Sequence, residues 1–187
     1  NRLQASLYGS VDVITPYRTP WRVIMAAEKA TELIENNDIV LNLNPKNKIE
    51  DTLWIKPGKV IRVSRLTQAD AIKCVDFAAE RGLQYIHIDA GWYGSEVLIS
   101  SDATSVAENR DFDMPELVSY AASKGIGVWV YVNQRALVQQ LDELLPLYKE
   151  WGLKGINFGF VQVGYQHWST WLHDAIRKCA EHGIMVD

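Results

Sequence analysis

The stretch "LTQADAIKCVDFAAERGLQYIHIDAGW", residues 66–92, decides the fold class. Its first part is typical of an amphipathic helix, because Thr67 and Asp70 form a capping box and apolar residues recur three and four positions apart until Gly82. From residue 83 onward the run is apolar and β-branched, as in a buried strand. A helix that ends at a glycine and leads directly into a strand is part of a β/α unit.

The same order repeats along the rest of the chain. Helical patterns end at glycines 82, 125, 152 and 183, and each glycine is followed within two residues by an apolar run. We expect strands over 60–64, 84–89, 127–132 and 156–161, with a fifth strand beginning after residue 183. Strands that are apolar on both faces and alternate with amphipathic helices predict a parallel sheet covered by helices.

Two α/β architectures fit such a repeat: a doubly wound open sheet and a (β/α)8 TIM barrel. No glycine-rich phosphate loop follows the first strand, which weakens the nucleotide-binding open sheet. Carboxylate, amide and aromatic residues stand at the strand ends instead, where barrel enzymes assemble their active sites. A full barrel needs about 250 residues, and only about 130 follow residue 60. The sequence therefore predicts the first half of a (β/α)8 TIM barrel.

The first 50 residues have a different pattern. "DVITPYRTPWRVIMAA" and "DIVLNLNP" have strand character and are separated by the turn signal "ENND". We expect residues 1–50 to be the tail of a preceding β domain with a linker, and residues 51–187 to be the first half of the catalytic barrel. The chain starts without Met and stops abruptly, so a segment of a longer protein is expected.

Composition excludes two classes of partner. The 187 residues carry a formal charge of -4 with no basic run or stripe, which argues against nucleic acid and against an anionic membrane surface. No apolar stretch approaches the ~20 residues of a membrane-spanning helix.

The motif "DAGW" contains the first candidate site residues. Asp89 ends an apolar strand, where its carboxylate can accept hydrogen bonds from sugar hydroxyls, and Trp92 can stack on a sugar ring. The alternative is that Asp89 caps a loop and Trp92 belongs to the core.

Three further residues are weaker candidates. Trp54 and Lys56 precede the first strand at a Pro-Gly turn, in either a functional loop or a connector. Asn133 ends the third strand, where an amide is more often a hydrogen-bonding loop residue than a catalyst.

Together, "TPWRVI", "DTLWIKPGK" and "YIHIDAGWYG" resemble the catalytic barrel of glycoside hydrolase family 97. The resemblance implies a bacterial hydrolase acting on oligosaccharides with α-linked galactose or glucose, in the periplasm or secreted. It also implies a sugar pocket lined by Asp89, Trp92, Trp54, Lys56 and Asn133. A calcium ion held mainly by glutamates is implied too, with ligands outside this segment.

The resemblance also identifies Gly159, in "GINFGF", as the position of the catalytic carboxylate in retaining members. Retaining members have a nucleophilic Asp at the end of the fourth strand, whereas inverting members use glutamates on the third and fifth strands to activate water. Here the third strand ends in Asn133 and Gln134, so neither carboxylate is present. The leading interpretation is a retaining exo-acting α-galactosidase whose nucleophile is replaced by Gly159. The alternatives are an inverting α-glucosidase whose base lies elsewhere, and a non-catalytic carbohydrate-binding relative.

Overall fold

The computed structural model describes residues 9–187. Residues 53–187 belong to one compact unit and residues 11–52 form another.

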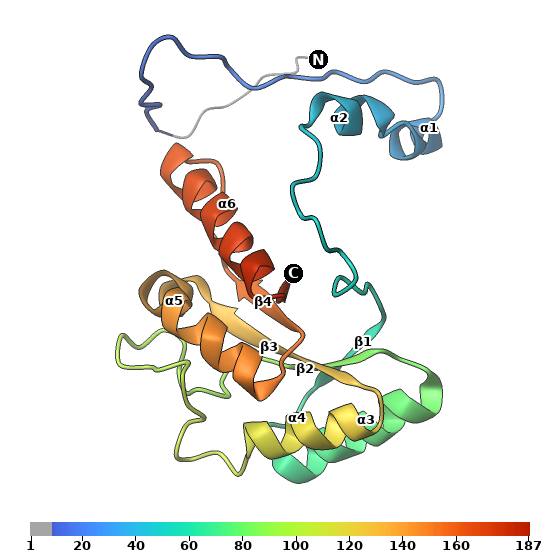
Figure 1. Ribbon diagram of the computed structural model, residues 1–187, viewed down its shortest axis with the longest axis vertical. Coiled ribbons are helices and arrows are strands. Elements are labelled where there is room, and N and C mark those ends of the chain that lie inside the picture. The colour runs from blue at the N-terminus through green and yellow to red at the C-terminus, as the bar shows by residue number, and fades with distance from the viewer. Residues whose placement is uncertain (1–8) are drawn as a thin grey trace. The chain divides into compact units, whose positions relative to one another are not determined.

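The larger unit is built on a parallel sheet of five strands in the order β1-β2-β3-β4-β5 (Figure 1). The strands are β1 (Val60–Val63), β2 (Tyr85–Ile88), β3 (Gly127–Asn133), β4 (Gly155–Gly159) and β5 (Met185–Val186). A doubly wound sheet reverses its strand order at a switch point, whereas a barrel adds each new strand beside the last. The sequential order therefore confirms the predicted α/β class and the barrel-type winding.

A helix follows each of the first four strands. These are α3 (Gln68–Arg81), α4 (Met114–Ser123), α5 (Gln134–Trp151) and α6 (Gln166–Glu181). The Thr67 side chain accepts a hydrogen bond of 3.3 Å from the Asp70 amide, as the capping pattern predicted. Gly82 ends α3 in the left-handed conformation, at φ 66°. No helix in the described residues is both long and apolar enough to cross a membrane.

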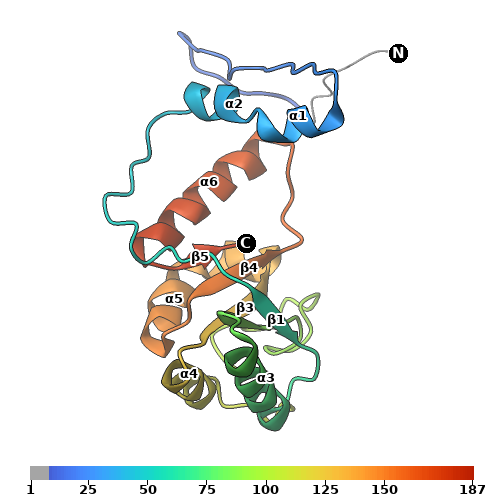
Figure 2. The same ribbon diagram turned by 90° about the vertical axis from the view of Figure 1, so that its right-hand side faces the viewer.

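The two faces of the sheet differ in chemistry. One face carries Ile86, Ile88, Val130 and Ile156, which are fully buried and belong to the apolar core. Helices α3 and α4 lie together along one side of the sheet (Figure 2). The opposite face carries polar and aromatic side chains: Arg62, His87, Trp129, Tyr131 and Asn157. The strands are therefore not apolar on both faces, which corrects that part of the sequence interpretation. Alternate residues point to opposite faces of a strand, so the polar set faces the side that becomes a barrel's interior.

Glycines on this second face lie under aromatic rings of the preceding strand. A Cβ atom added at Gly155 would stand 2.4 Å from the Trp129 ring, and one at Gly159 would stand 2.1 Å from the Tyr131 ring. Gly127 is crowded in the same way by Tyr85, at 2.6 Å. Real Cβ atoms essentially never approach other heavy atoms within 3.0 Å. Any larger residue at these positions would displace the ring above it.

The smaller unit contains two short helices, α1 (Ala30–Glu35) and α2 (Asp38–Leu43). No strand occurs between residues 9 and 52, so the strand character predicted there is not observed; residues 1–8 lie outside the described residues. A strand needs a neighbouring strand to pair its backbone groups, whereas a helix pairs them locally. The amides of Asn36 and Leu41 donate to the carbonyls of Glu32 and Asn37 in this local way.

Gly155→Ala should destabilise the barrel domain of the full-length protein. Overpacking of this kind typically costs about 1–3 kcal/mol, and about 2–4 °C of melting temperature is lost for each kcal/mol in domains of this size. Thermal unfolding followed by circular dichroism measures the change. Because the clash is with Trp129, the alanine should cost less when Trp129→Ala is already present. An unchanged melting temperature for the single variant would contradict the close contact.

Candidate functional site

Three of the predicted site residues meet at the C-terminal edge of the sheet. Asn133 and Gly159 are the last residues of β3 and β4, and they pair directly in the strand register. Asp89 follows the last residue of β2, whose register partner on β3 is Val130. Because parallel strands end at the same edge, these three residues share the position where barrel enzymes place their active sites.

The Asp89 carboxylate is held in a fixed orientation. Its Oδ2 atom forms an ion pair with the guanidinium of Arg62 on β1, and its Oδ1 atom accepts a 2.7 Å hydrogen bond from the Ala90 amide. The Asp89 side chain is 17 % exposed, whereas that of Arg62 is 70 % exposed. The carboxylate keeps free lone pairs, so it can still accept hydrogen bonds from the hydroxyl groups of a ligand.

Trp92 is a core residue, which corrects the prediction that it stacks on a sugar. Its side chain is fully buried, and its ring packs edge-on against Tyr93 with the centroids 5.1 Å apart. Its indole Nε1 donates a 2.8 Å hydrogen bond to the Tyr131 carbonyl. A buried indole usually finds such a partner, and here the bond joins the loop after β2 to β3.

Lys56 lies at the other edge of the sheet, together with the chain that precedes β1. Its carbonyl accepts a hydrogen bond from the Tyr85 hydroxyl, and its amide contacts Met185 Sδ at 3.4 Å. Tyr85 and Met185 are the first residues of β2 and β5. The structure therefore does not bring Lys56 to the edge that holds Asp89. Trp54, two residues earlier in the chain, is partly buried.

Tyr131 is the side chain that covers Gly159. It is 6 % exposed, and its hydroxyl accepts a 3.3 Å hydrogen bond from Asn133 Nδ2. Asn133 Oδ1 in turn accepts from the Arg135 amide at the start of α5. Asn133 thus caps a helix and orients the tyrosine, which is the hydrogen-bonding role that its residue type favours.

Glu96 is a candidate that the strand-end pattern missed. The loop after β2 carries it to Tyr131, and burial, then a hydrogen bond with the Glu96 carboxylate, raises the pKa of the tyrosine hydroxyl. The Glu96 Oε2 atom is buried without a hydrogen-bond partner in the described part of the chain. The only signal in the sequence is that Glu96 is the first carboxylate after Asp89.

Two consecutive residues at the start of α5 hold the loops on either side. Gln134 Oε1 accepts a 2.8 Å hydrogen bond from the Gln162 amide in the loop after β4. Arg135 Nε donates a 2.9 Å hydrogen bond to the Glu96 carbonyl in the loop after β2. Phe160, directly after Gly159, has a φ of 52° and is 83 % exposed. A left-handed conformation is uncommon for a bulky residue and often marks a functional site.

The family model for glycoside hydrolase 97 matches residues 54–187, and the model for the glycosyl-hydrolase 97 N-terminal domain matches residues 2–45. The chain belongs to glycoside hydrolase family 97. This confirms the resemblance stated above and identifies the sheet as part of a glycoside hydrolase barrel.

Two curated relatives within family 97 show how much of an enzyme the chain covers. It is 29 % identical over 178 residues to a probable retaining alpha-galactosidase of Streptomyces bingchenggensis, and covers 27 % of that protein. It is 27 % identical over 204 residues to a retaining alpha-galactosidase of Bacteroides thetaiotaomicron, and covers 30 % of it. The chain therefore spans less than a third of the length of these relatives.

Solved structures of family 97 share the fold. A family 97 enzyme from Pseudoalteromonas sp. strain K8 in complex with acarbose superposes with a TM-score of 0.73 at 22 % identity, over 86 % of this chain and 30 % of the enzyme. A variant of a family 97 enzyme from the same strain, in complex with panose, gives a TM-score of 0.71 at 22 % identity, with the same coverage.

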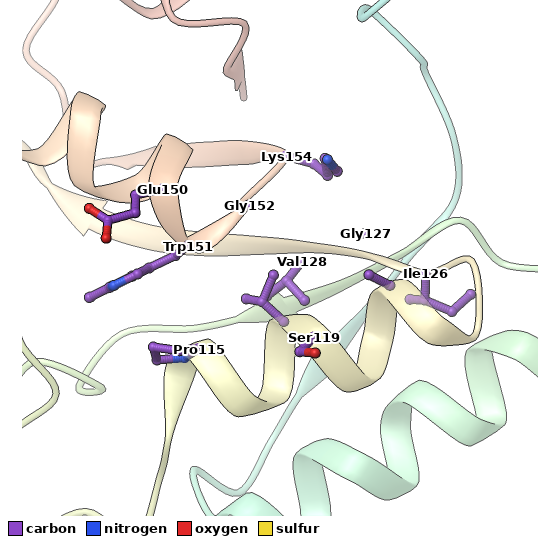
Figure 3. Close-up of a pocket in the computed structure, with 11 residues that line it drawn as sticks. Pro115, Ser119, Ile126, Gly127, Val128, Glu150, Trp151, Gly152 and Lys154 are labelled. Carbon is purple, nitrogen blue, oxygen red and sulfur yellow. The ribbon is translucent and has the colours of Figure 1, made fainter.

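A separate hollow of about 490 Å3 lies at the N-terminal edge of this family 97 sheet (Figure 3). Gly127 begins β3 and Lys154 precedes β4, while Pro115 and Trp151 line it from α4 and α5. The hollow is thus at the edge opposite Asp89 and Gly159, and we do not assign the sugar site to it.

Replacing Arg135 should free the loop that carries Glu96. Arg135→Met removes the donors to the carbonyls of Glu96 and Ile99. Arg135→Lys keeps the positive charge but loses the planar guanidinium that donates to both carbonyls. Both variants should be cut faster by thermolysin between residues 96 and 100, with the methionine variant cut fastest. Mass spectrometry of the fragments locates the cuts.

The matched control is Arg177→Met, because Arg177 pairs with Asp174 and Glu181 of its own helix. Equal cleavage of all three variants in this loop would show that Arg135 does not hold it.

Proposed function

We propose that the full-length protein is an exo-acting α-glycosidase, which removes a terminal α-linked hexose from an oligosaccharide. The observation that supports it is the polar C-terminal edge of a family 97 barrel, where Arg62 holds the Asp89 carboxylate toward the strand ends. Galactose is the first candidate sugar, because both curated relatives are named alpha-galactosidases.

The residue at position 159 bears on how the bond is cleaved. The sequence-based interpretation is a retaining enzyme whose nucleophile is replaced by Gly159, and the names of the relatives favour it. Such a replacement would leave room for the missing carboxylate, but the Tyr131 ring fills that room. This packing favours the second candidate, an inverting enzyme such as an α-glucosidase, in which water attacks the anomeric carbon directly.

A calcium ion and an export pathway are further proposals that rest on the family resemblance. In residues 9–187, no three side chains of His, Cys, Asp or Glu form a group that could hold a metal ion. We propose that its glutamate ligands come from outside this chain. We propose periplasmic or secreted localisation for the same reason.

The order in which sugar anomers appear tests the proposed function. We expect the full-length protein to hydrolyse an aryl α-galactoside, or as second candidate an aryl α-glucoside. Proton NMR during the first minutes should show the β-hexose first, because direct attack by water inverts the anomeric centre. Early release of the α-hexose would contradict the inverting mechanism. Sugar binding without hydrolysis would support the non-catalytic relative instead.

Gly159→Asp distinguishes a replaced nucleophile from a glycine that the packing requires. We expect the aspartate to clash with Tyr131, so that the variant loses both thermal stability and activity. The matched variant, Gly159→Asp with Tyr131→Ala, makes room and should recover part of the stability. If Gly159→Asp alone is stable and hydrolyses with retention, the replaced-nucleophile interpretation is correct.

A further inference from the structure

Phe160 has a backbone conformation that its side chain disfavours. Its φ of 52° lies in the left-handed region, which a bulky residue rarely adopts. Among the described residues 9–187, it is the only non-glycine residue with a positive φ. Such a conformation persists only where the surrounding structure imposes it, and it is found most often at functional sites. A phenylalanine in place of the glycine that this backbone favours therefore needs an explanation.

The residues around Phe160 are anchored, so its exposure is not that of a loose loop. Phe158 is 7 % exposed and belongs to the core, and Val161 packs against the same core. The Gln162 amide donates a 2.8 Å hydrogen bond to Oε1 of Gln134, whose side chain is itself buried. Phe160 nevertheless remains 83 % exposed. Its ring therefore has little contact with α5 or α6, although these two helices precede and follow β4.

The exposed ring lies at the rim of the edge that holds the candidate site. Gly159 ends β4 and Asp89 follows β2, so Phe160 is one residue beyond the C-terminal edge of the sheet. The Asp89 side chain lies deeper and is 17 % exposed. An enzyme that removes a terminal sugar takes that sugar into the closed end of its pocket, and the remainder of the oligosaccharide extends toward the rim. A ring at the rim is therefore placed for the leaving group rather than for the terminal hexose.

An aromatic ring at this position suits a sugar. The C–H groups on one face of a pyranose form an apolar surface, and an aromatic side chain offers a rigid apolar surface to pack against it. Ligand pockets combine such surfaces with a few polar groups that fix the orientation of the ligand. At this edge Asp89 is a hydrogen-bond acceptor for hydroxyl groups, and Phe160 is the apolar surface.

We propose that the Phe160 ring stacks on the leaving-group sugar of the oligosaccharide and is a specificity-determining residue. This inference rests on the proposed function, and it names a residue that recognises the part of the substrate that departs. It is independent of which residues activate water or protonate the leaving group. It therefore applies to an inverting and to a retaining enzyme alike.

Two substrates of the full-length enzyme, with and without a leaving-group sugar, test the inference. One is an α-linked disaccharide, and the other is the α-hexosyl fluoride of the same terminal hexose, whose leaving group is a single atom. Phe160→Ala should lower kcat/KM for the disaccharide by about three- to tenfold, the effect of losing one aromatic contact. For the fluoride, kcat/KM should change by less than about twofold, because no contact with a leaving-group sugar is lost.

Two further variants serve as controls for these kinetics. Phe160→Trp keeps an aromatic ring and should keep the preference for the disaccharide. Phe77→Ala makes the same change as Phe160→Ala at an exposed phenylalanine of α3, in the helix layer. It should leave kcat/KM for both substrates unchanged.

A glycine at position 160 separates a contact with the substrate from a contact within the protein. Glycine adopts the left-handed conformation without strain, so Phe160→Gly removes the ring and relaxes the backbone at the same time. We expect its melting temperature to be unchanged or higher, while kcat/KM for the disaccharide falls as it does in Phe160→Ala. A lower melting temperature would show that the ring packs inside the full-length protein, and would overturn the inference.

The outcomes also distinguish this inference from the proposed function. If the unmodified enzyme cleaves both substrates, and Phe160→Ala cleaves both equally well or loses activity on both alike, the ring does not recognise the leaving-group sugar. The inference is then wrong and the proposed function stands. If the unmodified enzyme hydrolyses no α-hexoside, the proposed function is wrong, and this inference with it.

Discussion

The close approach of an aromatic ring to a glycine on the next strand is the constraint on which the inner face of this sheet depends. Trp129 lies over Gly155, and Tyr131 lies over Gly159, with too little room for even a methyl group beneath either ring. The rings fill space that smaller side chains would leave open, and the glycines let them lie flat against the backbone. Each pair also fixes two adjacent strands relative to each other, from β3 to β4.

The same constraint changes how Gly159 is interpreted. From sequence alone, the family resemblance implies a carboxylate at this strand end in retaining members, so a glycine there suggests that a catalytic group has been lost. In the structure the Tyr131 ring packs over this glycine, and the Tyr131 hydroxyl accepts a hydrogen bond from the Asn133 side chain. The absence of a side chain at one position is thus balanced by a larger side chain at another.

The order and direction of the strands could be predicted from local features of the sequence. The Thr67 cap and the glycine after each helix are short-range features, so the β/α repeat and its parallel sheet could be predicted. Trp92 and Glu96 could not be assigned in this way, because both lie in the long loop of residues 89–113, whose course depends on distant contacts. Trp92 is held in the core by its indole hydrogen bond to the Tyr131 carbonyl, and Glu96 is held by the hydrogen bond from Arg135 to its carbonyl.

The strands predicted within residues 11–52 are absent for a related reason. Their β-branched and apolar residues are compatible with strands, but strand formation requires a partner that the pattern does not reveal. The position of a residue relative to its strand decides which edge of the sheet it reaches. Asp89 follows β2 and Gly159 ends β4, so both lie at the C-terminal edge, whereas Lys56 precedes β1 and lies at the N-terminal edge.

The two loop contacts at the start of α5 have a consequence for how this edge can move. Gln134 forms a hydrogen bond to the loop after β4, and Arg135 forms one to the loop after β2. The two residues are adjacent in the sequence. A tilt of this first helical turn would therefore draw both loops in the same concerted motion. The separation between the two loops at this edge is thus coupled to the position of a single helical turn.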